Sequence, residues 1–160
     1  MVNKYLPHVF VLPEDDANVQ LANEFHLQVN KLRQMQVLEP AGGWNEVLDS
    51  FEKVHVTEMR RCQPRFMILL LDFDRHNNRL QIAKQKIPPD LTDRVFVVGS
   101  WSDPEDLRAN EGSYKDIGLA TADDCRQGTN NIWGKPLLQH NAGELLRLRQ
   151  FVVPTILFPP

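Results

Sequence analysis

The sequence has few cysteines, and those present form no binding or cross-linking pattern. Only two occur, Cys62 and Cys125. They lack both the CxxC spacing and the nearby histidine pair of a zinc site, and two isolated cysteines do not make a disulfide framework. We therefore expect ordinary reduced thiols.

Long apolar runs are also missing. No stretch approaches the roughly 18 to 20 apolar residues needed to cross a bilayer, and residues 1–7 lack the apolar segment of a signal peptide. These absences favour a cytoplasmic protein that does not associate with membranes.

An excess of positive charge is the third missing feature. The 160 residues include 18 Lys and Arg against 21 Asp and Glu, which gives a formal net charge of -3. Such a chain has no global basic field to attract nucleic acid, so any contact with DNA or RNA has to be local.

The chain does contain the pattern of an α/β domain. Hydrophobic residues make up 42% and charged residues 24%, which is typical of one globular domain. Short apolar runs alternate with segments of helical period, so we expect a mostly parallel central sheet of about four strands flanked by helices. The expected strands cover residues 8–12, 36–38, 66–71 and 94–99. The expected helices cover residues 17–32, 44–54, 76–86, 114–126 and 142–150, with a turn or short helix led by Pro104.

The whole chain, residues 1–160, is expected to form a single domain. Its motifs lie within residues 9–107, and residues 108–160 form a C-terminal helical extension with a docked tail. Residues 151–158 are apolar but contain Pro154, which is compatible with an edge strand or a docked tail and not with a central strand.

Acidic side chains follow the first and third expected strands. Glu14 lies in Pro-Glu-Asp-Asp after the first strand, and Asp72 and Asp74 lie in Asp-Phe-Asp after the third. Adjacent parallel strands end about 5 Å apart, beside the usual ligand crevice, so these carboxylates can converge. Clustered carboxylates repel one another unless a cation lies among them, which favours Mg²⁺ or Mn²⁺. The alternative is that each acid caps the next helix, which fits Asp16 best.

A third acidic element, at residues 102–107, follows the fourth expected strand. Glu105 in this element could supply a ligand for a second cation. Alternatively, Asp103 before Pro104 starts a helix, with Glu105 in the first turn, where the helix dipole favours acids.

Other side chains near the expected strand ends could meet a substrate. Arg75 and Arg79 follow the third strand and could bind phosphates, or they could pair with the local acids. Trp101, after the fourth strand, could stack on a base. Lys135 could stabilise developing negative charge and His140 could carry a proton, unless each is structural.

An acidic residue after the first strand and Asp-x-Asp after the third, here Glu14 and Asp72-Phe73-Asp74, resemble the Toprim domain of primases, topoisomerases and small nucleases. The resemblance covers residues 9–107. It implies that Glu14 acts in acid-base chemistry and metal binding, and that the two aspartates hold Mg²⁺ for phosphodiester cleavage. Residues 105–107 are similar to the extra acidic element of the overcoming-lysogenisation-defect nucleases, which use two metals.

A competing resemblance is to response-regulator receiver domains. These place an acidic pair after the first strand, a phosphate-accepting Asp after the third, Ser or Thr after the fourth and Lys-Pro after a fifth. The matching residues are Asp15-Asp16, Asp72, Ser100 and Lys135-Pro136.

The Toprim resemblance leads us to expect a Mg²⁺- or Mn²⁺-dependent nuclease. Glu14, Asp72 and Asp74 would bind metal and act in catalysis, with Glu105 as a further ligand and Lys135 as a catalytic cation. Because the charge balance is acidic, a partner such as an ATPase subunit, as in the related phage-defence nucleases, or a second copy of the chain would supply affinity for DNA or RNA. The rival expectation is a receiver-like signalling module or a binding module without catalysis.

Overall fold

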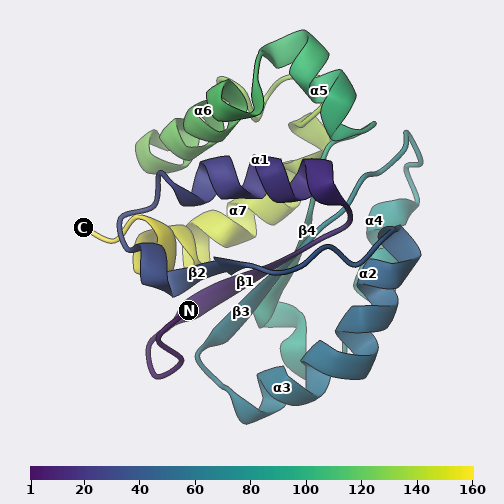
Figure 1. The fold of residues 1–160 in the computed structure, drawn as a ribbon. Coiled ribbons are helices and arrows are strands. Elements are labelled where there is room, and N and C mark those ends of the chain that lie inside the picture. The colour runs from purple at the N-terminus through teal and green to yellow at the C-terminus, as the bar shows by residue number, and fades with distance from the viewer.

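The computed structural model describes all 160 residues and contains one parallel sheet of four strands (Figure 1). The strands follow the spatial order β2-β1-β3-β4, and every neighbouring pair is parallel. Their bounds are β1 (His8–Pro13), β2 (Met35–Val37), β3 (Arg65–Leu70) and β4 (Val95–Val98). The predicted α/β class is therefore confirmed.

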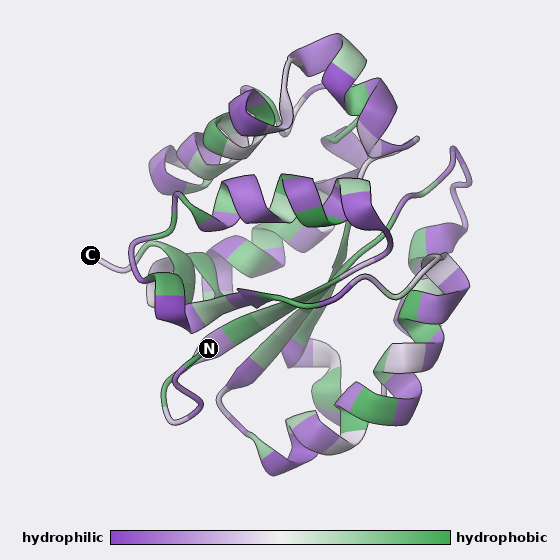
Figure 2. Cartoon of the chain, viewed as in Figure 1, coloured by the Kyte–Doolittle hydropathy of each residue, from purple (hydrophilic) through white to green (hydrophobic).

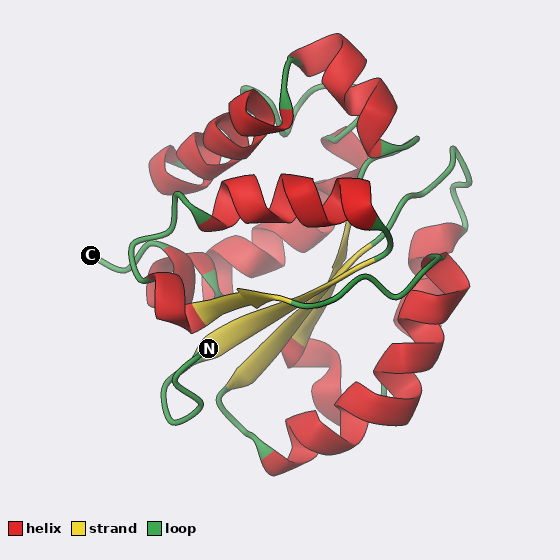
Figure 3. Ribbon diagram, in the orientation of Figure 1, coloured by secondary structure: helices red, strands yellow, loops and turns green.

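Helices cover both faces of the sheet, which lies in the middle of the molecule (Figure 3). Their bounds are α1 (Asp16–His26), α2 (Trp44–Ser50), α3 (Val56–Arg61), α4 (Arg79–Gln85), α5 (Pro104–Glu111), α6 (Tyr114–Gln127) and α7 (Ala142–Phe151). A π-helical turn, Phe51–His55, joins α2 to α3. Helices α1, α6 and α7 lie on one face, and α2, α3 and α4 lie on the other (Figure 1). None of these helices is both long and apolar enough to span a membrane.

The strands are apolar on both sides because both sides are buried. In β3, Ile68 and Leu70 face α1, α6 and α7, whereas Met67 and Leu69 face α2, α3 and α4. Side chains alternate between the two faces of a strand, so a strand covered twice reads as an unbroken apolar run. Figure 2 shows the same pattern, with predominantly hydrophobic strands and helices that mix hydrophobic and hydrophilic segments.

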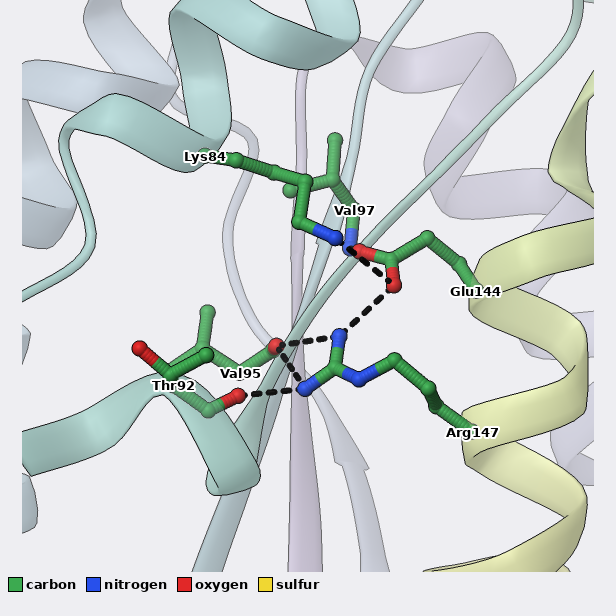
Figure 4. Close-up of polar contacts among 6 residues, drawn as sticks. All are labelled: Lys84, Thr92, Val95, Val97, Glu144 and Arg147. Carbon is green, nitrogen blue, oxygen red and sulfur yellow. Dashed lines mark hydrogen bonds and ion pairs between the residues drawn. The ribbon is translucent and has the colours of Figure 1, made fainter. Parts of the chain in front are cut away.

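The free edge of β4 is covered by side chains of α7 (Figure 4). Glu144 Oε1 accepts a hydrogen bond from Val97 N at 3.1 Å, and Arg147 Nη1 donates to Val95 O at 3.3 Å. Glu144 is only 2% exposed, and its Oε2 pairs with Arg147 and with Lys84 Nζ, the latter at 3.5 Å. Helix side chains therefore make the backbone contacts that a fifth strand would otherwise make.

Asn141, just before α7, continues this cover to the end of β4. Its Oδ1 accepts from Gly99 N at 3.1 Å, and its Nδ2 donates to Gly99 O at 3.0 Å. The sheet thus stops at four strands, and the residues directly before Lys135 form turns rather than a fifth strand.

Several elements differ from the sequence-based expectation. The helix expected over residues 44–54 consists of α2, the π-helical turn and α3 and continues to Arg61, and the helix expected over residues 76–86 begins at Arg79. The first helix ends at His26 rather than at residue 32, because Gln28 N and Val29 N bond to the carbonyls of Phe25 and His26 and tighten the chain into a turn. The C-terminal segment is the docked tail rather than the edge strand. It forms a π-helical turn, Val153–Leu157, with Ile156 and Leu157 buried in the core.

Candidate metal centre

Glu14, Asp15 and Asp72 converge where β1 and β3 end. The two strands are paired to their last residues, Pro13 opposite Leu70, and Glu14 N extends the pairing by donating to Leu70 O at 2.9 Å. One ligand atom from each of the three carboxylates lies within 4.8 Å of the others. We refer to these residues as the acidic trio.

A backbone contact fixes the side chain of Glu14 within the trio. Its Oε2 accepts a hydrogen bond from Asp72 N at 2.6 Å, and its Oε1 makes no hydrogen bond within the protein. Both residues are nearly inaccessible, with Glu14 9% and Asp72 5% exposed. The register of two adjacent strands therefore brings two buried carboxylates together.

Asn18 links the other carboxylates of the trio. Asp15 caps α1, since its Oδ1 accepts from Asn18 N and from Asn18 Nδ2, each at 3.0 Å. The same Nδ2 donates to Asp72 Oδ1 at 3.0 Å. Asn18 is fully buried, and its own Oδ1 has no partner within the protein. One amide thus orients two carboxylates and leaves a buried acceptor oxygen beside them.

Two carboxylates of the trio, Glu14 and Asp72, are buried, and Asp15 is half-buried beside them. Burial raises the pKa of Asp72 to about 7, the hydrogen bond from Asn18 opposes this rise, and the carboxylates of Glu14, Asp15 and Asp74 add to it. Burial also raises the pKa of Glu14, opposed by the hydrogen bond from Asp72 N and by Arg79. A cation among these groups would relieve both the desolvation and the repulsion.

Asp74 lies beside the trio but outside it. Its side chain is 49% exposed, and its Oδ2 is 2.8 Å from Arg79 Nη1. Arg79 is only 11% exposed, donates to Asp72 O at 2.7 Å and places its guanidinium carbon 4.4 Å from the centre of the Trp44 ring. Asp74 therefore faces a buried cation rather than the trio.

The turn that carries Asp74 is held in a strained conformation. Asp74 and Arg75 have positive φ angles of 47° and 61°, which non-glycine residues adopt at a cost. Asp74 N donates to Ser102 O at 3.2 Å and Arg75 N to Trp101 O at 2.8 Å. The loop after β4 thus imposes the shape of the turn after β3.

The remaining predicted site residues do not belong to the trio. Glu105 is exposed in the first turn of α5, and Asp103 caps this helix. The acidic element after β4 therefore starts a helix, which was the alternative interpretation of this segment. Arg75 is 64% exposed and pairs with Asp106 at 3.7 Å. Lys135 is exposed, and Trp101 is half-buried.

His140 lies in an aromatic contact rather than in the trio. Its ring is 4.7 Å from that of Phe73 and 5.3 Å from that of Trp101, measured between centroids. Burial lowers the pKa of His140 to about 4, and neither ring nitrogen has a hydrogen-bond partner. This environment keeps the imidazole neutral near pH 7.

The sequence-based hypothesis grouped Asp74, rather than Asp15, with Glu14 and Asp72, and it did not include Asn18. The sequence does contain a feature that could have pointed to Asn18 as a site residue. Asn18 is polar, follows the capping residue Asp15 by three positions and lies on the apolar face of α1. Burying an amide there is costly unless it has a polar partner, and its partners are the carboxylates.

The acidic trio could hold a metal ion, since its donors are carboxylate oxygens that lie within reach of one another. The unpartnered Asn18 Oδ1 is a fourth oxygen at this place. No protein-family model, curated protein or solved structure matches the chain.

Proposed function

We propose that the chain is a nuclease that cleaves phosphodiester bonds with Mg²⁺ or Mn²⁺ held at the acidic trio. The observation that carries this proposal is the convergence of Glu14, Asp15 and Asp72 from two neighbouring strand ends. Two buried carboxylates with a third, half-buried one beside them are unfavourable without a cation, and all-oxygen sites suit these hard cations. Bound there, the cation would polarise a phosphate oxygen and lower the pKa of an attacking water.

Glu14 is the candidate general base. Its Oε2 is occupied by Asp72 N, which leaves Oε1 to take a proton from water. Its raised pKa brings it closer to neutral pH, where proton transfer is more effective. As the water oxygen bonds to phosphorus, the P–O ester bond breaks and the leaving oxygen takes a proton from solvent.

Substrate contacts would come from the rim of the site. Arg75 is the more available cation for a phosphate because its side chain is exposed, whereas Arg79 donates hydrogen bonds to Asp72 O and Asp74 Oδ2. Trp101 and Lys135 are the candidate stacking and charge-stabilising residues. With a net charge of -3, the chain would rely on an ATPase subunit or a second copy of itself to bind DNA or RNA firmly.

The direct test is metal-dependent nicking of supercoiled plasmid and of single-stranded DNA and RNA, run with Mg²⁺, Mn²⁺ or EDTA. Asp72→Asn keeps the size of the side chain and should abolish cleavage and calorimetric binding of Mn²⁺. Asp16→Asn is the matched control, because Asp16 is exposed one position beyond the trio. If Mn²⁺ binds Asp72→Asn as tightly as the wild type, the metal lies elsewhere.

A receiver-like phosphate acceptor is the second candidate. One observation favours it: the trio pairs two adjacent acids after β1 with a single aspartate after β3. In that chemistry an Asp72 oxygen would attack the phosphorus of acetyl phosphate and release acetate. A hydroxylamine-sensitive phosphate on Asp72, with no cleavage of any nucleic acid, would replace the nuclease proposal by this one.

A further inference from the structure

A cavity of about 100 Å³ lies between the sheet and the helices α1, α6 and α7. Of its 20 lining residues, 17 are hydrophobic. Protein interiors rarely contain voids larger than a water molecule, whereas apolar cavities of about 150 Å³ stay dry and bind benzene or xenon. At about 100 Å³ the space is smaller than those cavities, so it has room only for a small molecule, and its apolar lining is poorly suited to water.

Small side chains on the facing helices leave this space open. Ala22 of α1 and Thr121 and Cys125 of α6 all line it. The two helices touch at Gly118, where a Cβ atom would lie 2.6 Å from the Cβ of Glu24. That contact sets the distance between α1 and α6, so the helices do not shift freely to fill the cavity.

The polar groups of the lining are already paired within the protein. Ser100 Oγ donates to Asp103 O at 3.1 Å, and Thr121 Oγ1 donates to Ile117 O at 2.8 Å. Trp133 Nε1 donates to Thr121 O at 3.2 Å. Burial raises the pKa of Cys125 to about 11, so its thiol stays protonated. The cavity thus offers shape and apolar contact, and its lining side chains leave no N–H or O–H donor unpaired for a polar ligand, with the Cys125 thiol as a weak S–H donor.

We propose that this cavity is a binding site for a compact apolar molecule, such as a hydrocarbon of about six carbon atoms. The site is separate from the acidic trio and does not depend on the function proposed for it. Apolar burial would supply the affinity, and a ligand with a strong hydrogen-bonding group would bind more weakly, because that group would be buried without an N–H or O–H partner.

Benzene is the probe, added to the full chain during thermal unfolding and in isothermal titration calorimetry. A ligand that binds only the folded state and is present at ten times its dissociation constant raises the melting temperature by about 3–6 °C for a domain of this size. Pyridine has the same shape with one acceptor nitrogen and should give a smaller rise. Asp72→Asn should keep the benzene response, which separates this cavity from the metal site.

Ala22→Leu fills the cavity and should abolish the response to benzene. Cys125→Met fills it from the facing helix and replaces Ala22→Leu as the test if that variant does not fold. Loss of the response in a folded filled variant supports the site. No rise with benzene in the wild type, or an equal rise in a folded filled variant, overturns it.

Discussion

Asp74 Oδ2 accepts a hydrogen bond from Arg79 Nη1 at 2.8 Å, and the same nitrogen donates to Asp72 O. One guanidinium therefore ties the exposed end of the Asp-Phe-Asp motif to its buried end. It does so while packed over the Trp44 ring, so the cation is fixed by an aromatic face as well as by oxygens. This arrangement makes Arg79 a positioning residue for the turn after β3.

Arg79→Met should destabilise the fold by about 1–3 kcal/mol, since it removes charged hydrogen bonds while keeping the length of the side chain. Urea denaturation measures the loss. Arg75→Met is the matched control on the same turn, and because Arg75 is 64% exposed it should cost less than about 1 kcal/mol. Equal losses in the two variants would contradict the positioning role.

The acidic trio should make stability fall as pH rises. The pKa of Asp72 is raised from 3.8 to about 7, so the folded state holds a proton that the unfolded state releases across this window. The proton makes its full contribution to the free energy of unfolding below about pH 4, and this contribution is lost as pH rises towards 7. Where the dependence is steepest, the free energy of unfolding falls by about 1 kcal/mol per pH unit. Because His140 contributes the opposite slope below pH 6.5, the test compares two proteins: in urea titrations the free energy of unfolding of the wild type relative to Asp72→Asn should fall between pH 4 and 7. A difference that does not change with pH would place the proton on another group.

Metal binding at the trio should show the opposite dependence on pH. Because the cation needs ionised carboxylates, Mn²⁺ has to displace the proton of Asp72, and its affinity should rise about ten-fold per pH unit below pH 7. Calorimetry in two buffers of different ionisation enthalpy would count the released proton. Affinity that is independent of pH between 5 and 7 would exclude Asp72 as a ligand.

His140 should limit stability on the acid side. Burial lowers the pKa of His140 from 6.5 to about 4. Between these pH values the unfolded state binds a proton at His140 and the folded state does not, so the free energy of unfolding decreases as pH falls from 6.5 towards 4. His140→Phe keeps an aromatic ring against Phe73 and lacks the titrating group. The free energy of unfolding of the variant relative to the wild type should therefore be about 1–2 kcal/mol higher at pH 5 than at pH 7. The control is His76→Phe in the exposed turn, which should retain the acid-side loss.

The cover on β4 can be tested at Glu144. Glu144→Ala leaves Val97 N and two cationic side chains without their acceptor and should cost about 3–5 kcal/mol. Glu144→Gln keeps an acceptor for Val97 N and should cost less. Urea denaturation compares the two, and sedimentation velocity should show self-association only for Glu144→Ala, through the uncovered strand edge.

The sequence predicted the parts of the site that depend on strand order. Glu14 and Asp72 meet because each follows an apolar strand, and alternation of strands with helices makes those strands parallel. The capping role was expected of Asp16, whereas the cap is Asp15, whose carboxylate also belongs to the trio. An aspartate that caps a helix and one that belongs to an acidic site occupy the same kind of position in the sequence. The orientation of α1, which only the structure gives, shows that Asp15 does both.

The position of Arg79 could not be predicted from the sequence. Its charge is buried because α4 lies beside α2, where Trp44 offers its ring, and this packing depends on how the two helices cover the sheet. The number of strands was predicted, but the way the β4 edge is closed was not, since side chains of Asn141, Glu144 and Arg147 that bond to a strand edge leave no pattern in the sequence.

The closing of the β4 edge by α7 also bears on how the protein forms during synthesis. All residues of the strands and the acidic trio have been made once the chain reaches residue 98. The hydrogen-bond partners of Val97 and Gly99, however, are Glu144 and Asn141, which follow much later in the chain. One face of the sheet also waits for Leu145, Leu148 and Ile156. A nascent chain that ends at residue 107 would carry every motif and expose an open strand edge and half of its core. The fold therefore closes only when residues 141–157 have left the ribosome, and until then the growing chain is most prone to pairing with another strand.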